Sequence, residues 1–338
     1  MFLISAQLIG GAKLIEVFWG IDYVVGLTFA FLVFIYVFFG GFKAVAYTDL
    51  IQGFLMLVSS VILFSKMLDL GGGINNLFKT ATSSLDKSLL LPSNADLKPQ
   101  YIISFWILIG IGILGQPQII NNFIAFKDEN AIKFSLPIST FIISFLIVLM
   151  HLIGFFAIIL FPDLSPNDKV VLNVALKVLN PFSCFMFFIG LLSAIMSTVD
   201  SNLLLITSVL IKSIFIYKED LKEDVKIGRV IMISNIFFIL IILIFSLFPP
   251  NFLFFINIFA FGALEVSFFP IIVFGLYLNF VSKIAAFASM FLGLIFYLSI
   301  VFFGLNIWFF HPVFPSFFVS IFTFLVVNFF CKKNSKVC

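Results

Sequence analysis

Long apolar stretches constrain the fold of this chain more than any other feature of its sequence. A helix needs about 20 mostly apolar residues to cross a bilayer, and the 338 residues contain ten stretches of that kind. They lie at residues 1–18, 21–39, 44–66, 101–124, 134–161, 182–214, 229–247, 251–278, 283–304 and 309–331. A segment in lipid must satisfy its backbone polar groups internally, which favours helices. The sequence therefore predicts an all-α polytopic membrane protein with about ten spans, forming a single transmembrane domain over residues 1–338.

Composition removes most other classes of protein. The chain is 62% hydrophobic and 10% charged, whereas soluble domains are about 45–50% apolar and about 25% charged. The net charge is +3, and the basic residues do not cluster into a block. We therefore expect membrane lipid and not nucleic acid as a partner. The three cysteines are dispersed, and His151 and His311 accompany no acidic pair or Cys/His cluster. We therefore expect no enzyme activity and no cofactor.

The distribution of basic residues predicts how the chain crosses the membrane. If the tail at 332–338 is cytoplasmic, alternating the spans places most of the 19 Lys and Arg residues on that side, as the positive-inside rule requires. The long polar loop at 68–100 is then extracytoplasmic. Residues 1–18 have no basic leader and no cleavage site, so we expect a first span there and not a signal peptide.

Three acidic residues, Asp49, Asp200 and Glu265, are predicted to be embedded in the membrane. A charged side chain at the centre of a membrane helix costs about 2.5–3.5 kcal/mol, so each of them needs a partner or a wet cavity. Asp49 is only six residues after Lys43, and it also fits a helix end that reaches the interface. Glu265 lies fourteen residues into its stretch, and it also fits a structural hydrogen bond.

A row of small polar residues surrounds Asp200. Ala194, Ser197, Thr198 and Ser201 are spaced i, i+3, i+4 and i+7, which places them on one face of a helix. Their hydroxyl and carbonyl oxygens are neutral ligands that suit a small monovalent cation. The same spacing also fits close helix packing, with the hydroxyls bonded to the preceding turn.

A third motif interrupts the stretch at 101–124. Gly110, Gly112, Gly115 and Pro117 fall at its middle, within ILIGIGILGQPQ. Glycine removes side-chain cover and proline removes a backbone donor, so we expect the helix to break near Gly115. Such a break is the best sequence pointer to the substrate site of a transporter, although a simple proline kink gives the same pattern.

Together these motifs resemble the sodium:solute symporter family. GGFKAVAYTDLIQG (40–53) resembles the signature at the start of its fifth core helix, SAIMSTVDSNLL (193–204) resembles its sodium-site helix, and GQPQ (115–118) resembles its broken sixth helix. The resemblance implies an inverted-repeat transporter core, sodium as the coupling ion and a bacterial inner membrane. It also favours the cation interpretation of the hydroxyl row over simple packing.

Within this family the chain is most similar to the sodium/pantothenate symporters. The likeness rests on four segments: SAQLIGGAKLIE (5–16), SFW (104–106), INIFAFGALEVSFFPIIVFGLY (256–277) and FFHPVFPSFF (309–318). It implies sodium-coupled uptake of pantothenate. Two alternatives stay open: symport of proline or another carboxylate, and an inactive remnant of a symporter. Family members carry about three more helices before the residue that matches Met1, so the resemblance predicts an N-terminally shortened chain that lacks the first core helices.

The resemblance also assigns site residues. It implies that sodium binds the carbonyl of Ala194 and the hydroxyls of Ser197 and Thr198. Asp49 and Ser201 match positions on the cytoplasmic path, where some members have a second cation position.

Asp200 matches a variable position of the family and is left out of the sodium ligands. The side chains that we expect to contact the substrate are Gln7, Trp106, Gln116 and Gln118.

Overall fold

A computed structural model describes residues 1–34, 37–84, 98–164, 168–217, 237–238, 240–249 and 253–333. These residues form helices and connecting turns, without a strand among them. Seven of the helices are long and apolar enough to cross a membrane. Of the other predicted spans, 21–39 contains only a shorter apolar helix, 101–124 is split, and most of 229–247 lies outside the described residues. The all-helical membrane fold is thus confirmed.

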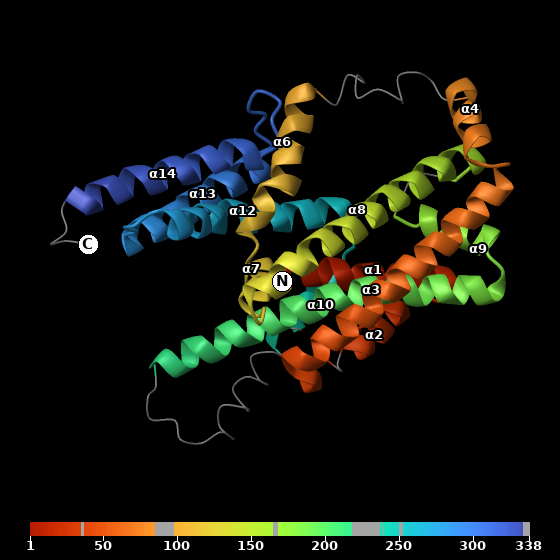
Figure 1. The fold of residues 1–338 in the computed structure, drawn as a ribbon, viewed down its shortest axis with the longest axis horizontal. Helices are drawn as coiled ribbons and strands as arrows, with labels where there is room; N and C mark the ends of the chain where they lie inside the picture. The colour runs from red at the N-terminus through yellow and green to blue at the C-terminus, as the bar shows by residue number, and fades with distance from the viewer. Residues whose placement is uncertain are drawn as a thin grey trace. The chain divides into compact units, whose positions relative to one another are not determined.

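The chain divides into two compact units, and the first comprises Met1–Leu85 and Lys127–Ile256. Its helix α10 packs most extensively on α3, and it also contacts α1 and α9. Further contacts join α1 to α2 and α3 to α8. The helices of this unit, labelled in Figure 1, are α1 (Phe2–Trp19), α2 (Tyr23–Phe34), α3 (Val37–Leu70), α4 (Ile74–Ser84), α8 (Glu129–Leu160), α9 (Val170–Val178) and α10 (Pro181–Tyr217).

The contact between α3 and α10 depends on a small residue. A β-carbon at Gly190 would collide with the side chain of Ser59 and would lie 3.0 Å from the carbonyl oxygen of Leu55. Small residues allow membrane helices to approach closely, where van der Waals packing holds them together. The unit has one apolar core around α1, α2 and α10 and another around α3, α8, α9 and α10.

Two short helices flank the predicted spans of this unit. The amphipathic segment at 163–180 contains α9, which buries Leu172, Val174 and Ala175. The segment at 68–100, which we expect to be an extracytoplasmic loop, contains the helix α4 at residues 74–84. Leu77 and Ala81, one helical turn apart, are both buried, which gives α4 an apolar face for packing against α8. Residues 85–97 of this loop lie outside the described residues.

The second unit comprises Asp86–Phe126 and Asn257–Cys338. Its helices α13 and α14 pack along each other, and α6 contacts α14. Its core contains Leu108, Val266, Tyr297, Val313 and Phe317. The elements are α6 (Pro99–Gly110), the short 3₁₀ helix η1 (Gly112–Gly115), α7 (Pro117–Ile124), α12 (Leu253–Tyr277), α13 (Lys283–Phe303) and α14 (Val313–Lys333). The first turn of α12, residues 253–256, belongs to the first unit.

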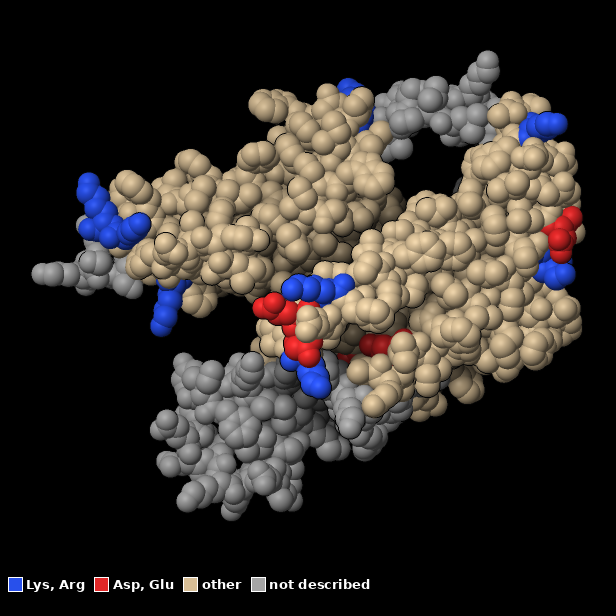
Figure 2. Space-filling model, viewed as in Figure 1, with Lys and Arg blue, Asp and Glu red and all other residues tan. Residues whose placement is uncertain are grey.

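The surface carries few charges and many large apolar side chains. Among the described residues on the face drawn in Figure 2, Lys, Arg, Asp and Glu form a few small groups and the remaining residues are uncharged. On α8, for example, Phe134 is 74% exposed and Phe141 is 71% exposed. Apolar surface of this extent is unfavourable in water and favourable in lipid, which agrees with a multi-pass membrane protein.

Candidate functional site

The predicted helix break occurs where the sequence indicated. Helix α6 ends at Gly110, η1 covers Gly112–Gly115, and Gln116 is extended with φ −90° and ψ 113° before α7 begins at Pro117. Proline disfavours the helical conformation of the residue before it, which explains the extended Gln116. The break near Gly115 is therefore confirmed.

The break lies directly against Glu265 of α12. A β-carbon at Gly112 would collide with the Glu265 carboxyl group, and one at Gly115 would lie 2.8 Å from both the Cα and the carbonyl oxygen of Glu265. Gln116 Nε2 donates to Glu265 Oε1 at 2.9 Å, and Gln118 Nε2 donates to Gln116 Oε1 at 2.6 Å. The structural hydrogen bond expected for Glu265 is therefore present, as part of a buried polar chain in the second unit.

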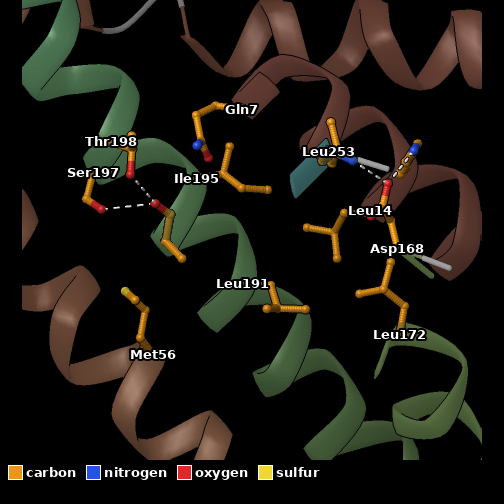
Figure 3. A pocket seen from close by; sticks show the side chains of 13 residues that line it. Gln7, Leu14, Met56, Asp168, Leu172, Leu191, Ile195, Ser197, Thr198 and Leu253 are labelled. Atoms are coloured by element: carbon orange, nitrogen blue, oxygen red, sulfur yellow. Dashed lines mark hydrogen bonds and ion pairs between the residues drawn. The ribbon is translucent and has the colours of Figure 1, made fainter. Parts of the chain in front are cut away.

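A cavity of about 400 Å³ lies in the first unit. Four of the predicted site residues line it: Gln7 of α1 and Ala194, Ser197 and Thr198 of α10. Figure 3 shows Ser197 and Thr198 on one side of the cavity and Asp168 and Leu253 on the other. The remaining lining residues are Gly10, Lys13, Leu14, Met56, Asp168, Leu172, Leu191, Ile195 and Leu253.

The hydroxyl row has a definite hydrogen-bond geometry. Ser197 Oγ donates to the carbonyl oxygen of Ala194 at 3.0 Å, and Thr198 Oγ1 donates to the same oxygen at 3.2 Å (Figure 3). These are the bonds to the preceding turn that close helix packing predicted. A hydroxyl that donates one bond keeps two acceptor lone pairs, so the row still offers oxygen ligands to a cation in the cavity.

Asp49 and Ser201, the other predicted cation residues, are not among the residues that line the cavity. Asp49 interacts electrostatically with Asp200 of the neighbouring α10, which is fully buried. The Oδ1 atom of Asp49 is also buried, and no hydrogen-bond partner for it occurs among the described residues. Asp200, which was left out of the predicted sodium ligands, therefore belongs to the surroundings of Asp49. The sequence signal for Asp200 was an acidic residue inside an apolar stretch.

The four predicted substrate residues have different surroundings. Gln7 lines the cavity of the first unit, whereas Trp106, Gln116 and Gln118 belong to the second unit. The Trp106 side chain is 69% exposed, and the two glutamines belong to the hydrogen-bonded chain with Glu265.

The sequence analysis missed an ion pair inside the cavity. Lys13 Nζ lies 2.7 Å from Asp168 Oδ2, and both residues line the cavity. The signal for Lys13 was its place in the middle of an apolar stretch. Its partner, 155 residues away, could not be identified from spacing.

Comparison with known proteins finds one family. A model of the sodium:solute symporter family matches residues 1–293. The sodium/pantothenate symporter of Haemophilus influenzae is 34% identical over 329 residues, which cover 96% of this chain and 68% of that protein. The sodium/pantothenate symporter of Escherichia coli is 32% identical with the same coverage. The osmoregulated proline transporter OpuE of Bacillus subtilis is 30% identical over 98% of this chain and 68% of its own length.

Proposed function

Because the chain belongs to the sodium:solute symporter family, we propose that it takes up pantothenate together with sodium by alternating access. The observation that carries the choice of solute is the similarity to two pantothenate symporters over 96% of the chain. Proline is the second candidate, because OpuE is 30% identical over a similar length. We also propose a bacterial inner membrane as the location, with a cytoplasmic C-terminal tail.

The proposed sodium site is the hydroxyl row that faces the cavity. A sodium ion there would accept the carbonyl oxygen of Ala194 and the hydroxyl oxygens of Ser197 and Thr198 as ligands. The three groups belong to residues that line one cavity, and their hydroxyl and carbonyl oxygens are neutral ligands that suit a small monovalent cation. Each hydroxyl would rotate its hydrogen away from the ion and present a lone pair.

We assign Asp49 and Ser201 to the path that sodium follows toward the cytoplasm. Support comes from the buried Oδ1 of Asp49 and from the buried carboxyl group of Asp200 in its surroundings. Acidic residues inside membrane spans commonly mark the pathways of ions.

For the solute, we propose Gln7 as a contact in the cavity of the first unit. Trp106, Gln116 and Gln118 are separate candidates for solute contact within the second unit. Gln7 is supported by its position among the cavity-lining residues, and the other three by the helix break on which a transporter's substrate site depends.

Sodium supplies enough free energy for uptake of a scarce nutrient. A potential of 100 mV contributes about 2.3 kcal/mol per charge, and a tenfold sodium gradient contributes about 1.4 kcal/mol. For a neutral solute, the sum of about 3.7 kcal/mol per sodium ion corresponds to several-hundredfold accumulation. A monoanion such as pantothenate that moves with one sodium ion carries no net charge, so only the gradient acts on it and the accumulation is about tenfold.

Uptake of radiolabelled pantothenate tests the proposal. The gene that encodes this chain is expressed in cells without pantothenate uptake of their own, and uptake is measured in sodium and in potassium buffers. We expect sodium-dependent accumulation that excess proline does not inhibit. Accumulation of proline instead would mean that the solute is proline and not pantothenate. Equal uptake in both buffers would contradict sodium coupling.

A further inference from the structure

The Lys13–Asp168 pair has two unusual properties for an ion pair. Its side chains are only 11% and 15% exposed, and both belong to residues that line the cavity. The Asp168 Oδ2 atom that binds Lys13 Nζ also accepts a hydrogen bond from the backbone N–H of Leu253 at 2.9 Å. An ammonium group and an amide donor therefore converge on a single carboxylate oxygen at the wall of the cavity (Figure 3).

A second ion pair already links the two segments that Lys13 and Asp168 join, so Lys13 and Asp168 are not needed for that link. Lys169 Nζ lies 2.8 Å from Glu16 Oε1, so it joins the same two segments of the chain. Its side chains are 33% and 30% exposed, and neither residue is among those that line the cavity. Burying an ion pair often contributes little to stability, because both charges lose their hydration. Holding α1 to the segment before α9 therefore does not explain why Lys13 is buried.

We propose that Lys13 binds the carboxylate group of the transported solute, which replaces Asp168 at Lys13 Nζ and at the Leu253 N–H. This inference rests on the proposed function and names its anion-binding residue. A solute carboxylate offers the same acceptor as Asp168, and charge-assisted bonds from ammonium to carboxylate are among the strongest hydrogen bonds. In the empty transporter, Asp168 keeps the charge of Lys13 balanced.

The dimensions of the cavity agree with this role. Its volume of about 400 Å³ falls within the range of about 300–1,000 Å³ that small-molecule sites occupy. Leu14, Leu172, Leu191 and Ile195 supply apolar walls. A few polar groups on apolar walls are typical of a site that fixes the orientation of a small organic molecule.

The charges in the cavity also explain why a cation and an anion would enter together. Lys13 and Asp168 sum to zero in the empty cavity. A sodium ion alone or a carboxylate alone would leave one unbalanced charge in apolar surroundings, which is costly. A sodium ion at the hydroxyl row and a monoanionic solute at Lys13 restore a sum of zero, so each favours the binding of the other.

The test compares an acid with its neutral analogue. Pantothenol carries a hydroxymethyl group where pantothenate carries the carboxylate. Variants Lys13→Gln and Asp168→Asn are introduced into the gene that encodes this chain, and half-saturation is measured for pantothenate uptake and for its inhibition by pantothenol. Glu16→Gln, which removes the second ion pair, is the matched control.

The two variants should act in opposite directions. Lys13→Gln should raise half-saturation for pantothenate about tenfold or more and abolish the preference for acid over alcohol. Asp168→Asn removes the competing carboxylate, so it should lower half-saturation for pantothenate severalfold without changing inhibition by pantothenol. Glu16→Gln should leave both values unchanged. If both cavity variants weaken the acid and the alcohol equally, the pair is a structural contact and the proposal is wrong.

Two further measurements keep this result separate from the identity of the solute. If Asp168→Asn does not accumulate in the membrane, the double variant Lys13→Gln/Asp168→Asn, which buries no unpaired charge, should accumulate and lack the preference for the acid. If the wild-type protein takes up proline instead, the same comparison is made between proline and prolinamide, which keeps the ring amine and lacks the carboxylate. Purified wild-type protein should be stabilised against heat more by one of these acids than by its analogue without a carboxylate, and equal stabilisation by both members of each pair would overturn the role of Lys13.

Discussion

The hydroxyl of Thr198 is the single oxygen whose removal tests the sodium site most directly. Thr198→Ala should raise the sodium concentration for half-maximal uptake by about tenfold, because a lost bond to a charged group is worth about 1.5–3 kcal/mol. The measurement is uptake at a series of sodium concentrations with equal amounts of protein in the membrane.

Thr28→Ala is the matched control for Thr198→Ala. Thr28 makes the same bond to the preceding turn, with its hydroxyl donating to Val24 at 3.0 Å, but it is exposed on α2. It should leave sodium dependence unchanged. An equal response of the two variants would mean that the Thr198 hydroxyl serves only the helix.

The charge of Asp49 is the subject of a second substitution. Asp49→Asn keeps the shape of the side chain and removes its charge next to Asp200, so sodium-coupled turnover should slow severalfold while the amount of folded protein stays normal. Initial rates at saturating sodium and solute measure this effect. Asp69→Asn, at an exposed acidic residue of the same helix, is the control, and wild-type rates in both variants would make Asp49 an interfacial residue.

At the scale of single residues, it was easier to predict which side chains are unusual than to predict which residues they interact with. The sequence singled out Asp49, Ser197, Thr198 and Glu265, because charges and hydroxyl rows are conspicuous in apolar stretches. It did not indicate that Asp200 interacts with Asp49. That contact depends on how α3 and α10 pack, and helical spacing within one element carries no such information.

At the scale of elements, the helix break should require its glycines. Gly115→Ala should lower the melting temperature in detergent and reduce uptake, because the new β-carbon would lie 2.8 Å from the α12 backbone at Glu265, and forced overpacking costs about 1–3 kcal/mol. Gly110→Ala is the control, since a β-carbon there meets no atom within 4 Å. Equal melting temperatures of the two variants would contradict this account of the break.

An element was predictable from the sequence where its own residues determine its structure. The break at Gly112–Gly115 followed from glycine and proline chemistry. Helix α4 was missed because its segment is polar overall, while only Leu77 and Ala81 provide the face that packs. Tertiary packing thus decided an element that local composition did not.

At the scale of the whole molecule, the orientation in the membrane can be tested with reporter insertions. Alkaline phosphatase inserted after Ser84 should be active, and green fluorescent protein inserted after Lys333 should fluoresce, because basic residues such as Lys127, Lys133 and Lys283 favour the cytoplasmic side. The opposite pattern of activities would reverse the proposed topology.

The architecture as a whole was only partly accessible from sequence. Apolar stretches indicated a polytopic membrane protein, since length and hydropathy are local properties. The ion pair between Lys13 and Asp168 joins residues far apart in the chain, as does the hydrogen bond between Gln116 and Glu265. Such contacts arise only when helices from distant parts of the sequence are packed.

The close contact at Gly190 also limits how a sodium ion can move. With no side chain at Gly190, Ser59 occupies the space between α10 and α3, and two helices packed so closely shift together. Thr198 lies on one of these helices and Asp49 on the other, so we expect the distance between the two proposed ion positions to change little during transport. An ion that leaves Thr198 for Asp49 would then travel a path of nearly constant length, and we expect other helices to open and close access to its two ends.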